Sequence, residues 1–196
     1  MKRRSLVVAA AGAVAALPLL PPDVLAFTRA VRAQMVRGSG LQTLDPHQHA
    51  TVAQVADLIM PATDNPTSPA ASAANVAEFI DVVLTGWYAD DDKAAFLAGL
   101  KDLDTQSHTA FGKDFVDGTP GQQTALLQGL DDETARWNRS PSKTRGPEPF
   151  WHRMKWLTVY GYYSSEAGLV KDQRFVMIPG KYVPCAPADS SATGDF

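Results

Sequence analysis

The sequence predicts a mainly α-helical protein: a single helical domain of about five helices, with long proline-rich loops and an extended C-terminal tail. Three observations lead to this fold class. The 196 residues suit one domain. Apolar residues recur at helical spacing in five segments, and this spacing ends after Gly168. With 45% hydrophobic and 20% charged residues, the chain can bury a core without metal or disulfide support.

The first two predicted helices have clear boundaries. Asp45 is a helix N-cap, Pro46 suits the first turn, and Gln48 completes a capping box. This helix runs to residue 60 and ends at a proline, after which residues 61–72 form a proline-bearing loop. The next segment, from position 76 to position 87, has the strongest amphipathic pattern in the chain and is the second helix.

Three more helices follow. Three aspartates at positions 90–92 favour a helix start through the helix dipole, and this helix extends toward Phe115. Thr119 and Pro120 begin a fourth helix in the manner of the first. Residues 140–149 hold three prolines and a glycine and form a loop. Residues 150–164 form a fifth, unusually aromatic helix.

The N-terminus has the three parts of an export signal. Residues 2–4 are basic, residues 6–20 form an uncharged apolar run, and small or apolar residues precede a cleavage position after Ala26. The apolar run is shorter than the roughly 20 residues that a membrane span needs. We therefore predict a signal peptide over residues 1–26, followed by a linker over residues 27–44.

Paired arginines give the signal a more specific interpretation. Arg3 and Arg4 are followed, after one residue, by Leu6 and Val7. This order, before a weakly hydrophobic alanine-rich run, is typical of substrates of the twin-arginine translocase, which carries folded proteins. A general secretion signal and an uncleaved anchor are the alternatives.

Charge and cysteine content exclude several classes of protein. The net charge of −3 and the scattered basic residues argue against nucleic-acid binding. The one cysteine, Cys185, excludes an internal disulfide framework, a CxxCH haem attachment site and a CxxC metal motif. Glycine-rich phosphate loops of the dinucleotide and P-loop types are also absent from the sequence.

The sequence predicts neither catalytic residues nor a metal site. His47 and His49 lie two residues apart, so on a helix they face different directions, and no third ligand is near in the sequence. His108 and His152 have no evident nucleophile partner, and a Gly-x-Ser-x-Gly motif does not occur. The aspartates at 90–92 are a solvated helix start.

Two features are open to several interpretations. The aromatic side chains of residues 150–163 suit core packing, a protein interface or a cofactor contact. Cys185, in the extended tail, is either a free thiol or half of an intermolecular bond.

Four segments, in this order, resemble the gluconate 2-dehydrogenase subunit 3 family. They are residues 55–64 (VADLIMPATD), residues 76–81 (VAEFID), residues 161–168 (GYYSSEAG) and residues 179–185 (PGKYVPC). The resemblance covers residues 45–187, which we take as the domain, and leaves residues 188–196 as a disordered tail. Members of the family are small subunits of bacterial membrane-associated sugar or sugar-acid dehydrogenases, and the twin-arginine signal agrees with them.

The resemblance implies a non-catalytic accessory subunit. In such complexes an FAD-containing large subunit oxidises the sugar, and a cytochrome c subunit with haem c passes the electrons on. The small subunit holds no cofactor, supports folding and assembly, and carries the twin-arginine signal with which the flavoprotein is co-exported. The implied location is the periplasm, at the inner membrane through the partner subunits.

The aromatic helix and the tail are the predicted surfaces for the large subunit. The predicted interface residues are Trp151, Trp156, Tyr160, Tyr162, Tyr163, Tyr182 and Cys185. Alternatives from other classes are an independent periplasmic small-molecule-binding protein or enzyme, and an interaction module of a different exported oxidoreductase.

Overall fold

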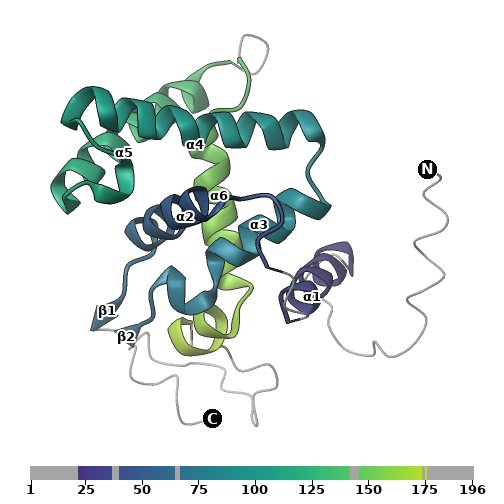
Figure 1. Ribbon diagram of the computed structural model, residues 1–196. Helices are drawn as coiled ribbons and strands as arrows, with labels where there is room; N and C mark the ends of the chain where they lie inside the picture. Colours follow the sequence, from purple (N-terminus) through teal and green to yellow (C-terminus); the bar gives the residue numbers. More distant parts are fainter. Residues whose placement is uncertain (1–21, 37–39, 65–66, 142–145, 174, 176–196) are drawn as a thin grey trace.

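Helices account for most of the structure, a computed structural model that describes residues 22–36, 40–64, 67–141, 146–173 and 175 (Figure 1). Within these segments six α-helices occur: α1 (Pro22–Val36), α2 (Pro46–Ile59), α3 (Val76–Gly86), α4 (Asp90–Phe111), α5 (Pro120–Arg139) and α6 (Phe150–Tyr163). The mainly helical prediction is confirmed, and the five predicted helices correspond to α2–α6. None of the described helices is both long and apolar enough to cross a membrane.

The predicted helix starts at residues 45 and 119 are confirmed in detail. The Asp45 side chain accepts a hydrogen bond from the Gln48 backbone N–H (2.8 Å), and Gln48 Oε1 accepts one from the Asp45 N–H (3.1 Å). Thr119 and Gln122 repeat this reciprocal pair at the start of α5. Both capping boxes satisfy N–H groups that the first turn of a helix leaves free.

Helix α4 ends before the predicted Phe115. Gly112 adopts a left-handed conformation (φ 73°), and its N–H bonds to the His108 carbonyl at 2.9 Å. This is a common way to end a helix, because glycine has no Cβ to oppose a positive φ. A short helix, η3 (Phe115–Asp117), follows and buries Phe115.

The loop predicted over residues 61–72 contains short strands and a helical turn that the sequence did not predict. Strands β1 (Thr63–Asp64) and β2 (Thr67–Ser68) pair antiparallel, with Thr63 opposite Ser68 and Asp64 opposite Thr67. The helix η2 (Ala71–Ala74) then leads into α3. A two-residue ladder is too short to leave a period in the sequence, so it could not be predicted.

The core forms around α3 and α6. Helix α3 contacts α1, α2 and α6, and α6 runs through the middle of the fold between the other helices (Figure 1). The largest fully buried side chains include Phe79 and Ile80 of α3 and Met154 and Leu157 of α6. The π-helical η4 (Ala167–Asp172) follows α6 and packs against it.

The predicted linker over residues 27–44 is largely structured, so that interpretation is corrected. Pro22 begins α1, as proline can in a first turn. Val31 of α1 is fully buried, and α1 packs on α3. The amphipathic pattern of α1 is too weak to predict a helix from the sequence. The helix depends instead on its tertiary contact with α3. The N-terminal 21 residues, and the tail with Tyr182 and Cys185, lie outside the described residues.

Candidate functional site

Two of the predicted interface residues belong to the core. Trp151 is 5% exposed and its Nε1–H donates to Asp131 Oδ1 (2.9 Å), while Tyr162 is fully buried and its hydroxyl donates to the Pro69 carbonyl (2.7 Å). For these side chains the core interpretation is correct. Tyr163 is half-buried, with its ring edge-on to Tyr162 at a centroid distance of 5.0 Å.

The other two predicted residues on α6 form part of an aromatic surface, which we define as Phe27, Trp87, Trp156 and Tyr160. Trp156 is 53% exposed and stacks on Tyr160, with ring centroids 5.0 Å apart and planes inclined by 6°. Phe27 lies 6.0 Å from Tyr160 and 5.2 Å, edge-on, from Trp87, which is 42% exposed. The surface thus joins α6, the start of α1 and the end of α3.

Sequence reasoning found only the α6 half of this surface. The i, i+4 spacing of Trp156 and Tyr160 on one helix face was a usable signal. The sequence predicts a linker at Phe27 and an amphipathic helix that ends at Trp87, whereas in the structure Phe27 is in α1 and Trp87 follows the last residue of α3. No pattern in the neighbouring residues predicts the contact between these two rings.

Arg32 fixes α1 beneath this surface. Its guanidinium donates to the carbonyls of Gly161 (2.6 Å) and Ala74 (3.2 Å), and lies 5.2 Å from the centre of the Phe79 ring. Gly161 is in the last turn of α6, where carbonyls lack partners within the helix and attract a positive charge. Burial lowers the pKa of Arg32 from its ordinary value. Arg32 therefore ties α1 to the C-terminal end of α6.

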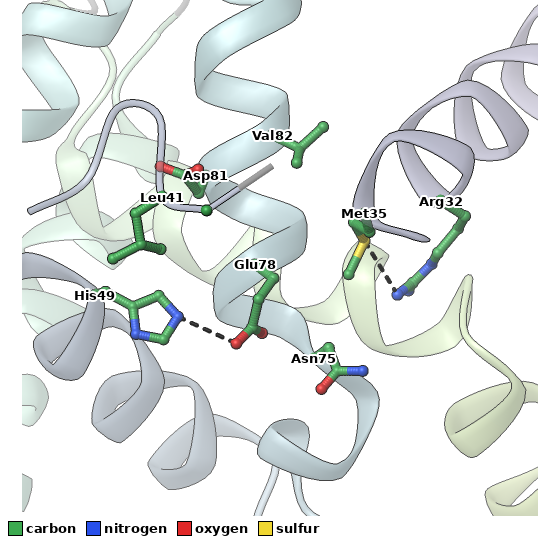
Figure 2. A pocket seen from close by; sticks show the side chains of 9 residues that line it. Arg32, Met35, Leu41, His49, Asn75, Glu78, Asp81 and Val82 are labelled. Atoms are coloured by element: carbon green, nitrogen blue, oxygen red, sulfur yellow. Dashed lines mark hydrogen bonds and ion pairs between the residues drawn. The ribbon is translucent and has the colours of Figure 1, made fainter. Parts of the chain in front are cut away.

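A cavity of about 630 Å³ opens beside α1, between residues 40–41 and helices α2 and α3 (Figure 2). His49 Nε2 lies 3.3 Å from Glu78 Oε1 in its wall, and Arg32 and Met35 form another part of the wall. Asp81, also in the wall, accepts three backbone N–H bonds from residues 42–44. The volume is in the range of small-molecule sites. His49, Glu78 and Asp81 already have polar partners, whereas Arg32 Nε is buried without a hydrogen-bond partner among the described residues.

A cluster of two histidines and two aspartates joins the first turn of α2 to α4 and η3. His47 Nε2 lies 2.8 Å from Asp104 Oδ2, and His108 Nε2 lies 2.7 Å from Asp114 Oδ1. One ligand atom from each of His47, Asp104 and Asp114 lies within 4.8 Å of the others. The hydrogen bond to Asp104, which outweighs the effect of burial, raises the pKa of His47.

The sequence could not show this cluster. His47 and His49 do diverge as expected, toward Asp104 and Glu78 respectively. The groups beside His47 are two aspartates that are distant in the chain, and the packing of α4 and η3 against α2 brings them there.

The comparison with protein families decides the identity. Residues 46–180, more than half of the chain, match the family model described as gluconate 2-dehydrogenase subunit 3. The chain belongs to this family. The resemblance seen in the sequence is confirmed, and membership of gluconate 2-dehydrogenase subunit 3 makes the chain a subunit of a dehydrogenase complex. Among curated proteins and solved structures, none matches it.

Three of the four motifs that resemble subunit 3 lie among the described residues, and side chains and glycines in them have structural roles. A Cβ on Gly161 would lie 2.8 Å from Phe79 Cδ1, so glycine allows α6 to approach α3 closely. A Cβ on Gly168 would lie 2.4 Å from the Tyr162 carbonyl oxygen. Asp57 Oδ1 accepts the Ser72 N–H (2.7 Å) and so holds the start of η2 against α2. The family match begins after α1, so Phe27 and Arg32 lie outside it.

Proposed function

We propose that this chain is the non-catalytic small subunit of a periplasmic, FAD-dependent gluconate or sugar dehydrogenase, and that it supports folding, assembly and twin-arginine co-export of the catalytic flavoprotein. The family membership supplies the complex. The aromatic surface is the single observation that carries the accessory role. Trp156 and Trp87 expose 53% and 42% of their surface, and Trp and Tyr are the side chains most enriched at the energetic centres of protein interfaces.

The proposed partner on the aromatic surface is the FAD-containing large subunit. Two stacked or edge-on pairs hold the four rings in place before binding, so docking would cost little side-chain entropy. The two exposed tryptophans flank two half-buried rings, and grouped exposed apolar side chains are a feature of interaction sites. The substrate, the FAD and the haem c then belong to the partner subunits, and the cytochrome c subunit receives the electrons.

The position of α1 supports the co-export role. The paired arginines, Arg3 and Arg4, stand shortly before α1, which Val31 and Arg32 attach to the folded domain. Cleavage after Ala26 would leave Phe27, a member of the aromatic surface, as the first residue of the mature chain. A flavoprotein bound at this surface would therefore be carried next to the signal, and would reside in the periplasm at the inner membrane.

The interface is tested by co-purification with the flavoprotein. Trp156→Ala and Trp87→Ala should each weaken the complex about thirty-fold, as expected for an interface hot spot worth about 2 kcal/mol. Trp137→Ala is the matched control, because Trp137 is a half-buried tryptophan on α5 whose ring centroid lies 5.3 Å from that of His152. Equal affinity of all three variants and the unchanged protein would contradict the assigned surface.

Export is tested separately. We expect Arg3→Lys with Arg4→Lys to retain both this subunit and the flavoprotein in the cytoplasm, because the flavoprotein is proposed to have no signal of its own. A flavoprotein that still reaches the periplasm would refute the co-export role.

A second function, binding of a small molecule, is favoured by the cavity of about 630 Å³ between α1 and α3. The isolated chain would then bind a sugar or sugar acid, and His49→Ala, which removes one wall residue, would weaken that binding. Isothermal titration of the isolated chain with gluconate distinguishes this function from the accessory role, which predicts no binding.

A further inference from the structure

We propose that His47, Asp104 and Asp114 form a binding site for a divalent transition-metal ion of the zinc type. The site goes beyond the proposed function, which assigns no metal to this chain. It joins three elements: the first turn of α2, the middle of α4, and the residue that precedes η3. A bound ion would fasten the N-terminus of α2 to the α4–η3 corner.

The distances suit an ion after small side-chain rotations. The three ligand atoms lie within 4.8 Å of one another, and His47 Nε2 and Asp104 Oδ2 are only 2.8 Å apart. Zinc bonds of about 2.0–2.2 Å to nitrogen and oxygen place neighbouring ligand atoms roughly 3–3.5 Å apart in a tetrahedron. The fourth position would be taken by water, since the cluster is at the surface and the His47 side chain is 44% exposed.

Both carboxylates are already oriented by second contacts. Asp104 Oδ1 accepts the Phe115 backbone N–H (3.1 Å), which directs Oδ2 toward His47. Asp114 Oδ1 lies 2.7 Å from His108 Nε2. Metal sites commonly hold their ligands by such outer hydrogen bonds, and loss of one typically lowers affinity by about 10–100-fold. His108 is therefore a positioning residue for Asp114.

The chemistry of the ligands selects the class of ion. Imidazole nitrogen combined with carboxylate oxygen suits zinc, cobalt, nickel or copper, whereas calcium and magnesium prefer oxygen ligands alone. One neutral histidine and two carboxylates also balance the charge of a divalent ion. Since the metal must replace the proton on His47, affinity should rise with pH.

The competing explanation is a network of ion pairs without metal, and zinc titration of the full chain separates the two. The background variant Cys185→Ser removes the thiolate as another zinc ligand. We expect one saturable zinc site per chain, weakened at least about ten-fold by His47→Ala and by Asp114→Asn. His49→Ala is the matched control: His49 is on the same helix, but its Nε2 lies 3.3 Å from Glu78 Oε1 and not in the cluster of His47, Asp104 and Asp114.

Cobalt provides a second measurement that does not depend on stability. Bound cobalt in a four-coordinate site should give intense visible absorption, which zinc displaces and which Asp114→Asn reduces while circular dichroism stays helical. No saturable zinc binding would overturn the proposal. So would equal affinity in His47→Ala, Asp114→Asn and His49→Ala. Neither result bears on the complex with the flavoprotein, whose co-purification tests a different surface.

Discussion

The Asp81 carboxylate gives the sharpest test of how the structure is held together. It is 3% exposed and accepts three backbone N–H bonds, from Gln42 (2.9 Å), Thr43 (2.9 Å) and Leu44 (2.7 Å). These bonds fasten the segment between α1 and α2 to the middle of α3, in the wall of the cavity (Figure 2). The informative substitution is Asp81→Asn, which keeps the shape of the side chain and removes the charge.

The magnitude follows from the three bonds. Asparagine retains one acceptor oxygen, so the bonds of Thr43 and Leu44 to Oδ1 persist without charge assistance. The amide nitrogen of the asparagine replaces Oδ2 and faces the Gln42 N–H. Two donors cannot form a hydrogen bond, so the bond from Gln42 is lost. A hydrogen bond to a charged group contributes about 1.5–3 kcal/mol, so one lost and two weakened bonds should cost about 3 kcal/mol. For a chain of this length the melting temperature should fall by roughly 6–12 °C.

Asp57→Asn is the matched control. Asp57 Oδ1 also accepts a backbone N–H, from Ser72 at 2.7 Å, but this is a single, exposed bond. Urea unfolding should give a loss of about 1 kcal/mol for Asp57→Asn. Hydrogen exchange should become faster at the amides of Gln42, Thr43 and Leu44 only in Asp81→Asn. A loss no greater than that of the control, or unchanged exchange, would refute the reasoning.

Two further predictions concern packing and pH. Gly161→Ala should destabilise the chain by about 1–3 kcal/mol in urea unfolding, because its Cβ would lie 2.8 Å from Phe79 Cδ1; Gly129→Ala, with open space around it, should not destabilise it. Hydrogen bonds from the Lys155 and Trp151 side chains lower the pKa of Asp131. The stability that these two bonds provide is fully present above the pKa of Asp131 in the unfolded chain. It is lost as the pH falls through the lower pKa that Asp131 has in the folded chain. The stability difference between the unchanged chain and Asp131→Asn should therefore shrink below about pH 4, and a constant difference would contradict this.

Helices with strong local signals were predicted correctly. The capping boxes at Asp45 and Thr119 and the amphipathic pattern of α3 depend on residues within one or two turns of each other, so they can be read in the sequence. Helix α1 has no such signal. Its helical state depends on burying Val31 and on bonding Arg32 to α6, and these contacts exist only in the folded chain.

The candidate sites show the same contrast between local sequence signals and contacts made by tertiary packing. The sequence showed that residues 150–163 are rich in aromatic side chains, but not which of them are buried. Packing of α6 against its neighbours buries Trp151 and Tyr162 and leaves Trp156 exposed. Phe27 from α1 and Trp87 from the end of α3 complete the aromatic surface around Trp156.

The helical class, the boundaries of most helices and the family could be read from the sequence alone, because each of these is encoded in short segments. Three features came from the folded structure: α1 is part of the fold, four rings form one surface, and His47 lies close to Asp104 and Asp114. Those groups are far apart in the chain. Their proximity depends on how whole helices pack, which the side-chain spacing within any one helix does not specify.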